Sequence, residues 1–388
     1  MPDSIQVLMA DDSVAVRRMV SETLQRCPGI DVVGAARDGR EVVDLAARLK
    51  PDVILLDVEM PVMDGIEALR EIRRQDRHLP VLMFSSLTVK GAEATLDALA
   101  LGANDYVAKP NGVDNVQQAV DYIKRELVPR IMHWGSRRSA VPARLTSRPT
   151  ESTQPTPVAS ERSVTQPKST LHRPVATAPT GLPAKKAGVI NAVAIGSSTG
   201  GPNALAEVVP NLPRDLSVPV FIVQHMPAVF TQLLAERLNR LTPLTVTEAK
   251  DGDPVVPGRV YLAPGGCHMV VQQVGKERRI ALNQDEPENS CRPAVDVLFR
   301  SVACVYGGNT LAVVLTGMGR DGTEGCRVLA GQGATIVVQD EASCVVWGMP
   351  RSVEEAGLAD RIVPLNSVAT EIAQRIRNHR RQPEPALT

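Results

Sequence analysis

The sequence predicts an α/β protein with two domains, each built on a doubly wound, mostly parallel sheet. Strand-like apolar runs alternate with helical periods over residues 1–127, and the same alternation resumes at Val189 and continues to about residue 380. Such alternation is typical of parallel strands joined by right-handed helical crossovers. The length of 388 residues, with 43% apolar and 22% charged residues, also fits a globular protein of two domains.

A segment of different composition separates the two domains. It is rich in Ser, Thr, Pro, Ala and Arg, and from residue 136 to 187 its only acids are Glu151 and Glu161. Such a stretch buries too little apolar surface to offset the entropy lost on ordering. We therefore predict a flexible linker over 128–187, which either contacts an acidic partner or is a solvated basic tether. The last residues, 381–388, are expected to be a frayed tail.

Composition and charge exclude several classes of function. Aromatic residues make up only 3% of the chain, too few for a surface that stacks on single-stranded nucleic acid. The formal net charge of zero removes any overall attraction to a polyanion. No apolar run reaches the length of about 18 residues that spans a membrane. The first residues lack the pattern of a secretory signal, and the six Cys form no CxxC pair. We expect a cytoplasmic protein that neither binds nucleic acid nor inserts into a membrane.

The elements of the first domain follow from its apolar periods. Helical periods occupy the segment after Ser13 and four further segments. The expected strands are 5–11, 31–36, 52–58, 80–86 and 105–109, and the later helices are near 39–49, 65–75, 89–101 and 113–126. Five strands that alternate with five helices predict one parallel sheet.

Acidic and polar side chains gather where these strands end. Asp11 and Asp12 end the first strand and Asp57 the third, while Ser85 and Lys109 end the fourth and fifth. Ligands of open α/β sheets bind at this edge. Three converging carboxylates repel one another unless a divalent cation lies among them, and hard oxygen ligands suit Mg²⁺. A cation, a lysine and a hydroxyl around one carboxylate predict a phosphoryl-transfer site.

These residues, with MPVMDG at 60–65 and Pro110 after Lys109, resemble the receiver domain of bacterial two-component response regulators. The resemblance covers essentially all of 1–127 and implies a flavodoxin-like fold with Asp57 as the phosphoacceptor. It implies that Ser85 and Lys109 contact the phosphoryl group. Tyr106 is either a switch aromatic or a core residue. The implied Mg²⁺ ligands are Asp11, Asp12, Asp57 and the main-chain carbonyl of Glu59.

The second domain opens with a buried strand, VINAVAIG at 189–196, followed by a helix from Gly201. Between them Gly196-Ser-Ser-Thr-Gly200 fits G-x-S-x-G and places Ser198 at a sharp strand-to-helix turn. The helix N-terminus presents main-chain N–H groups that suit an oxyanion. A turn rich in Gly and Ser also occurs in phosphate-binding sites, or simply because the backbone needs a sharp turn. The motif alone therefore does not identify Ser198 as a nucleophile.

Two further strand ends complete a possible catalytic set. His225 ends the strand 218–225, and Asp321 follows the strand 310–317. A serine, a histidine and an aspartate at three strand ends have the geometry of nucleophilic catalysis. The chain order Ser, His, Asp is not that of the α/β-hydrolases. A histidine at a strand end is also compatible with a structural role.

Six stretches of this half resemble the catalytic domain of CheB-type protein-glutamate methylesterases, and they are spread over nearly all of 189–360. The resemblance implies a Rossmann-like domain, here placed at 188–380, in which Ser198 is the nucleophile, His225 the general acid/base and Asp321 its orienter. Thr199 and Met318 would border the site and help form the oxyanion hole. The stretches are AIGSSTGGP (194–202), VQHMP (223–227), YLAPGGCHM (261–269), RPAVDVLF (292–299), LTGMGRDG (315–322) and QDEASCVVWGMP (339–350).

Together the two resemblances imply a phosphorylation-activated hydrolase. Its substrates would be glutamate γ-methyl esters on methyl-accepting chemoreceptors, with glutamine deamidation as a side activity. A histidine kinase would be the phosphodonor, and the unphosphorylated receiver would cover the active site. We expect no cofactor in the second domain. The alternative is a non-enzymatic, phosphorylation-switched module that binds a receptor. A DNA-binding output domain lacks a basic recognition helix.

Three other polar residues of the second domain were considered for the site. His268 follows a turn and is expected to be structural. Asp296 is expected to be a capping or surface acid, and Arg292 a possible contact for an acidic substrate peptide.

Overall fold

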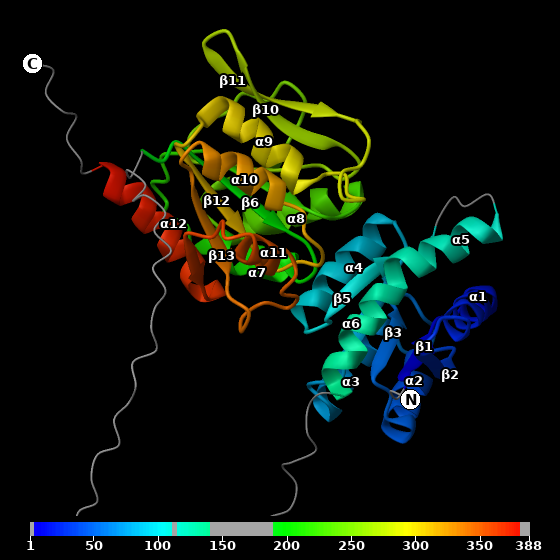
Figure 1. Cartoon of the computed structure of the whole chain (residues 1–388). Helices are drawn as coiled ribbons and strands as arrows, with labels where there is room; N and C mark the ends of the chain where they lie inside the picture. Colours follow the sequence, from blue (N-terminus) through cyan, green and yellow to red (C-terminus); the bar gives the residue numbers. More distant parts are fainter. Residues whose placement is uncertain (1–3, 111–114, 140–188, 381–388) are drawn as a thin grey trace, which may run out of the picture. The chain divides into compact units, whose positions relative to one another are not determined.

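The computed structural model describes residues 4–110, 115–139 and 189–380 (Figure 1). The described residues of 1–140 and 187–388 fall into one compact unit. The predicted tail and the predicted linker from residue 140 onward lie outside the described residues.

The first domain contains a five-stranded parallel sheet with the order β2-β1-β3-β4-β5. The order reverses between β1 and β3, and the residues after these two strands therefore lie side by side at the carboxyl edge of the sheet. The strands are β1 (Ile5–Ala10), β2 (Ile30–Ala36), β3 (Val53–Asp57), β4 (Val81–Ser85) and β5 (Asp105–Ala108). Each predicted strand is present, to within two residues at its ends.

Helices cover both faces of this sheet. Side chains of α2, α3 and α4 pack on one face, and side chains of α1 and of the C-terminal helical segment pack on the other. Local signals set the helix starts: the Ser13 hydroxyl caps α1, and Asp64 and Glu67 form a capping box at α3. The helices are α1 (Val14–Gln25), α2 (Gly39–Leu49), α3 (Gly65–Gln75), α4 (Val89–Ala100) and α5 (Val116–Tyr122).

The C-terminal helical segment of this domain is longer than predicted. After α5 it continues through a π-helical turn (Ile123–Leu127) into α6 (Val128–Ser139). Leu127, Ile131 and Trp134 are buried, and their spacing places them on one helix face against the first domain's core. The predicted boundary between residues 127 and 128 therefore falls inside a packed helix, and residues 128–139 are helical, not part of a flexible linker.

The second domain contains a seven-stranded, entirely parallel sheet with the order β14-β13-β12-β6-β7-β9-β8. The chain moves outward from β6 through β7 and later returns to β12 on the other side of β6, so a switch point lies between β6 and β12. An antiparallel hairpin, β10 (His268–Val274) and β11 (Glu277–Asn283), forms a separate two-stranded sheet. The sheet strands are β6 (Ala192–Ser197), β7 (Val220–Gln224), β8 (Thr245–Glu248), β9 (Arg259–Leu262), β12 (Thr310–Val314), β13 (Thr335–Gln339) and β14 (Arg361–Val363). The predicted pair of doubly wound domains is confirmed.

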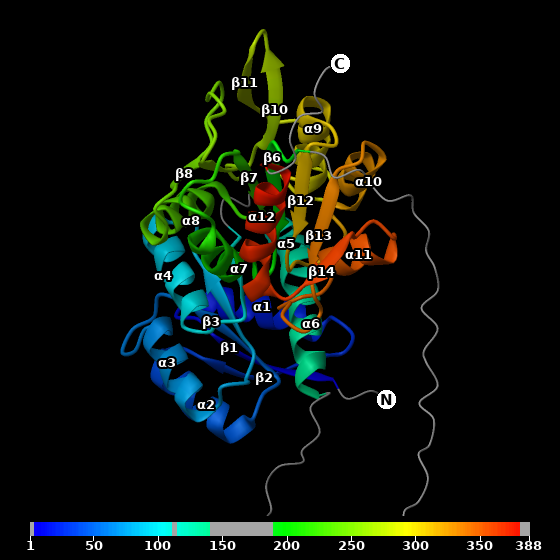
Figure 2. The same cartoon turned by 90° about the vertical axis from the view of Figure 1, so that its left-hand side faces the viewer.

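The alternation of side chains along β6 shows how the layers form. Val193 and Ile195 pack with α7, α8 and α12, whereas Ala192 and Ala194 pack with α9, α10 and α11 on the opposite face (Figure 2). Both faces are buried, which explains the continuous apolar run of this strand. The helices are α7 (Gly201–Val208), followed by a 3₁₀ turn (Val209–Asn211), then α8 (Ala228–Leu241), α9 (Val295–Tyr306), α10 (Thr323–Gly331), α11 (Met349–Glu355) and α12 (Leu365–Arg380).

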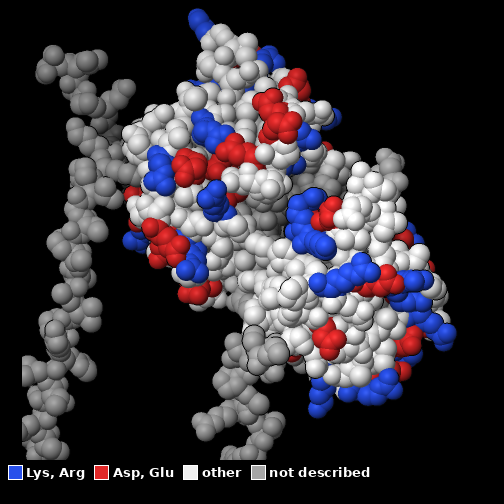
Figure 3. All heavy atoms as spheres, turned by 45° about the vertical axis from the view of Figure 1, so that its right-hand side comes forward, with Lys and Arg blue, Asp and Glu red and all other residues white. Residues whose placement is uncertain are grey.

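None of the helices in the described part of the chain is long and apolar enough to cross a membrane. On the face shown in Figure 3, basic and acidic side chains are intermingled.

Candidate active site

Ser198 lies in the sharp turn between β6 and α7, as the G-x-S-x-G motif predicts. Its main-chain N–H donates to the carbonyl oxygen of Thr316, 3.0 Å away, which ties the turn to the residues after β12. Gly200 has φ +77° and caps α7, a conformation that glycine adopts without strain. A Cβ atom on Gly201 would lie 1.8 Å from Oε1 of Gln224, so only glycine fits there.

Gln224, which the sequence analysis did not single out, holds this turn. It is 1% exposed; its Oε1 accepts from the Ser197 hydroxyl at 2.7 Å, and its Nε2 donates to the Ser198 carbonyl oxygen at 2.9 Å. The β6–β7 register pairs Ser197 with Gln224. In the sequence, the only signal for Gln224 is its place directly before the candidate histidine. Its role follows from the strand register, which the sequence does not show.

His225 and Asp321 are in direct contact. Nε2 of His225 lies 2.8 Å from Oδ2 of Asp321, and the Asp321 side chain is 3% exposed. The three candidate residues follow β6, β7 and β12, which are neighbours in the sheet. The structure thus brings together the strand ends that the sequence analysis selected.

Main-chain N–H groups surround the Asp321 carboxylate. Val295 N–H donates to Oδ2 at 2.6 Å, and Asp296 N–H and Gly322 N–H donate to Oδ1, each at 3.0 Å. Val295 and Asp296 form the first turn of α9, where free N–H groups favour an anion. Burial raises the pKa of Asp321, but the His225 hydrogen bond and charge and these N–H donors outweigh burial, so its pKa is lowered.

The pKa of His225 is shifted in the opposite direction to that of Asp321. Burial disfavours the imidazolium, but the hydrogen bond to Asp321, reinforced by the contact with Cys291, raises the pKa of His225 well above its usual value. The other ring nitrogen, Nδ1, lies 3.5 Å from Sγ of Cys291. Within the described residues no hydrogen bond joins the Ser198 hydroxyl to His225, although both side chains line the same cavities.

Thr199 and Met318 border this site, as expected. The Thr199 carbonyl oxygen accepts from the Thr316 hydroxyl at 2.9 Å, which fixes the main chain after Ser198. The Thr199 hydroxyl donates to Oδ2 of Asp105, a residue of β5, at 3.2 Å. Met318 lines a cavity together with Ser198 and His225.

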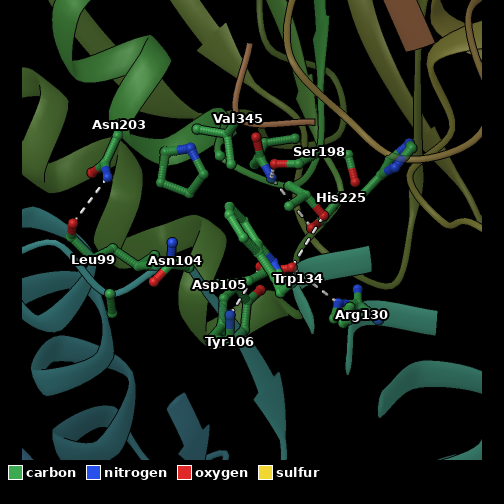
Figure 4. A pocket seen from close by; sticks show the side chains of 15 residues that line it. Leu99, Asn104, Asp105, Tyr106, Arg130, Trp134, Ser198, Asn203, His225 and Val345 are labelled. Carbon is green, nitrogen blue, oxygen red and sulfur yellow. Dashed lines mark hydrogen bonds and ion pairs between the residues drawn. The ribbon is translucent and has the colours of Figure 1, made fainter. Parts of the chain in front are cut away.

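Residues of the first domain also line the cavity at Ser198, which has a volume of about 130 Å³ (Figure 4). The Tyr106 ring stacks on Phe230 of α8 with 4.8 Å between ring centroids. Asn203 of α7 donates to the carbonyl oxygen of Leu99 at 2.9 Å. Tyr106 therefore contacts the second domain and is not simply a core residue of the first.

The second cluster of functional side chains lies in the first domain. Ligand atoms of Asp11, Asp12 and Asp57 all lie within 4.8 Å of one another. The Lys109 ammonium lies 2.7 Å from Asp57 and 2.8 Å from Asp11. Burial raises the pKa of Asp57 to about 6, although Lys109 opposes this effect. Three carboxylates with one lysine leave an excess of negative charge on hard oxygen donors, which fits Mg²⁺.

Two further predicted residues lie next to this cluster. The main-chain N–H of Glu59 donates to Oδ1 of Asp57 at 3.4 Å, which places the Glu59 backbone at the site. Ser85 is fully buried, and its hydroxyl donates to the Gly91 carbonyl oxygen at 3.0 Å. A contact with a phosphoryl group on Asp57 would require this hydroxyl to rotate.

The other polar residues have structural contacts. His268 is 1% exposed, and its Nδ1 accepts from Ala294 N–H at 3.2 Å. Asp296 is 1% exposed, so it is not a surface acid, and its Oδ1 accepts from Gly325 N–H near the start of α10. Arg292 donates to the carbonyl oxygens of Gln284 and Asp285, so its guanidinium holds this loop.

Comparisons with known proteins show the family to which the chain belongs. The response regulator receiver domain model matches residues 7–121, and the CheB methylesterase model matches residues 193–372. A protein-glutamate methylesterase/protein-glutamine glutaminase of Trichodesmium erythraeum is 44% identical over 96% of this chain and 99% of its own length. A protein of the same name from Nocardioides is 45% identical over 98% of each chain. The chain belongs to this family. Among solved structures, the Thermotoga maritima CheB methylesterase catalytic domain is 43% identical and covers 48% of this chain and 98% of its own, with a TM-score of 0.47.

Membership of the methylesterase family confirms the predicted class of enzyme, a hydrolase with a receiver domain. It disfavours the non-enzymatic receptor-binding alternative.

Proposed function

We propose that this methylesterase hydrolyses glutamate γ-methyl esters on chemoreceptors through Ser198, His225 and Asp321. The observation that carries this proposal is the 2.8 Å contact between Nε2 of His225 and Asp321, next to Ser198 in the strand-to-helix turn. A serine is a weak nucleophile unless an adjacent base takes its proton, and the base needs a third group that orients it.

The contacts of the imidazole support a role for each ring nitrogen. Because Nε2 is held by Asp321, Nδ1 is the atom that accepts the Ser198 proton, and Cys291 must yield its place there. Ser198 Oγ then attacks the ester carbonyl carbon, and the protonated Nδ1 gives its proton to the departing methanol. Water, deprotonated by the same nitrogen, releases the glutamate carboxylate and frees Ser198. With a glutamine side chain, the same steps release ammonia.

The tetrahedral intermediates need donors for their negative oxygen. The N-terminus of α7 directly follows Ser198, and Thr199 and Met318 lie at the borders of the site, so these residues would shape the oxyanion hole. One oxyanion donor is worth on the order of 10²–10³-fold in rate.

The receiver domain would gate this chemistry. Asp57 is the proposed phosphoacceptor, and Ser85 and Lys109 would contact the phosphoryl group. Mg²⁺, held by Asp11, Asp12, Asp57 and the Glu59 carbonyl, would neutralise charge during the transfer from a histidine kinase. We place the protein in the cytoplasm, where that kinase and the receptors' signalling segments are accessible.

Contacts between β5 and the active-site turn support inhibition by the unphosphorylated receiver. The Asp105–Thr199 hydrogen bond and the stacking of Tyr106 on Phe230 involve residues on or next to the proposed site. Phosphorylation at Asp57 would weaken these contacts and open the site. A coupling of about 1–3 kcal/mol corresponds to a roughly 5–150-fold change in activity.

The direct test is methanol release from methylated chemoreceptors by the Ser198→Ala variant. We expect release to fall by on the order of 10⁶-fold, because the hydroxyls of Ser197 and Thr199 on either side donate to Gln224 and Asp105 and do not replace Ser198. The matched control is Ser367→Ala, which alters a serine of α12 that does not line the cavity. Retained release by Ser198→Ala would overturn the nucleophile assignment.

A further inference from the structure

Asp321 belongs to a network of side chains that the proposed mechanism leaves unused. The side-chain amide of Asn289 donates to Oδ1 of Asp321 at 3.0 Å and to Oδ2 of Asp296 at 2.9 Å. One amide nitrogen thus uses its two hydrogens on two different carboxylates. Asp296 is 1% exposed, so its carboxylate must be satisfied within the protein.

Each of the two carboxylates also accepts hydrogen bonds from main-chain N–H groups at the start of the other residue's helix. Asp296, on α9, accepts from Gly325 N–H near the start of α10 at 2.6 Å. Asp321, just before α10, accepts from the N–H groups of Val295 and Asp296 at the start of α9. The helices α9 and α10 lie side by side (Figure 1). Each carboxylate therefore caps the other residue's helix, and Asn289 joins them.

The turn that carries Asn289 has an unusual backbone. Asn289 and Ser290 have φ values of +52° and +62°, the left-handed region that non-glycine residues rarely adopt. The main chains of Glu288 and Cys291 exchange hydrogen bonds of 2.9 and 3.1 Å, so these four residues form a tight turn. Asparagine tolerates this conformation better than most residues.

The same turn is anchored to α9. Both guanidinium NH groups of Arg300 contact the Glu288 carboxylate, one of them at 2.7 Å. At its other end the turn places Sγ of Cys291 3.5 Å from Nδ1 of His225. A turn held in a costly conformation by several bonds, with Asn289 bound to Asp321 and Cys291 next to His225, indicates a functional constraint.

We propose that Asn289 and Asp296 are positioning residues that fix the Asp321 carboxylate so that its Oδ2 faces His225. This role rests on the proposed triad. Donors from Asn289, Asp296 and Gly322 occupy Oδ1, while Oδ2 accepts from Val295 N–H and faces the imidazole. Without the Asn289 amide, the neighbouring carboxylates of Asp296 and Asp321 lose the donor that they share and repel each other more strongly. The Asp321 carboxylate can then rotate away from Nε2 of His225.

The test is steady-state kinetics of methanol release by the full-length Asn289→Gly variant. Glycine keeps the left-handed turn and removes only the amide. We expect kcat to fall by about tenfold or more, as for a lost hydrogen bond to a charged group, with KM unchanged. The matched control is Lys50→Gly, a change at a left-handed residue of the first domain, at the end of α2, which should leave kcat unaltered.

A double-mutant cycle separates positioning from a merely structural role. If Asn289 acts through Asp321, adding Asn289→Gly to Asp321→Asn should lower kcat no further. Additive losses, or an unchanged kcat in Asn289→Gly alone, would overturn the positioning role while leaving the triad intact. An unchanged kcat in Asp321→Asn alone would instead reject the triad.

Discussion

Both domains place acidic groups at the carboxyl edge of a parallel sheet, but the two edges satisfy those groups differently. In the receiver, Asp11, Asp12 and Asp57 converge, one lysine contacts Asp11 and Asp57, and burial raises the pKa of Asp57 to about 6. In the esterase domain, N–H donors and His225 surround Asp321 and lower its pKa. An edge where three carboxylates converge on few donors suits a cation, whereas an edge where several donors surround one carboxylate can hold it as a fixed partner for an imidazole.

The largest expected effect comes from removing the charge at the esterase edge. Asp321→Asn should lower kcat by on the order of 10⁴-fold, because the carboxylate that fixes the tautomer and the orientation of the His225 ring is removed. The contacts that raise the pKa of His225 include this carboxylate, so its loss should lower that pKa. Since the neutral imidazole is the base, the acidic limb of the pH–rate profile should move to lower pH.

The pH–rate profile of methanol release checks this prediction against Glu324→Gln, a change at an exposed acid of α10. A limb that stays in place would show that Asp321 does not set the ionisation of His225.

The next effect concerns the receiver edge. Asp57→Asn removes the phosphoacceptor, so the ratio of activity with acetyl phosphate to activity without it should fall from roughly 5–150 to one. Asp44→Asn, at an exposed position of α2, is the matched control and should keep the full ratio. Persistent stimulation of Asp57→Asn would place the phosphorylation elsewhere.

The smallest expected effect comes from placing a buried charge without a partner behind the Ser198 turn. Gln224→Glu keeps the shape but replaces the N–H donor to the Ser198 carbonyl with an oxygen. We expect a loss of about 1–3 kcal/mol in the free energy of unfolding, measured by chemical denaturation. The same change at Gln273, exposed on β10, should have no effect. Equal stability of the two variants would contradict the structural role of Gln224.

Much of this architecture follows from local sequence patterns. The burial of both sheet faces makes β6 a continuous apolar run, and glycines mark the turn that exposes Ser198, so strand and turn were predicted together. His225 and Asp321 were predicted because each follows such a strand. By contrast, α6 was assigned to the linker, because the composition of the following residues outweighed the short apolar face of Leu127, Ile131 and Trp134.

The sequence by itself determined the two parallel sheets, the strand ends that carry Ser198, His225, Asp321 and Asp57, and the family to which these motifs belong. Periodicity and turn chemistry act over a few residues, so they can be read along the chain. Only the tertiary structure decided which atoms face each other: Nε2 rather than Nδ1 toward Asp321, Gln224 behind the serine turn, and Asn289 between two carboxylates. These contacts depend on strand register and on left-handed turn conformations, which join residues far apart in the sequence.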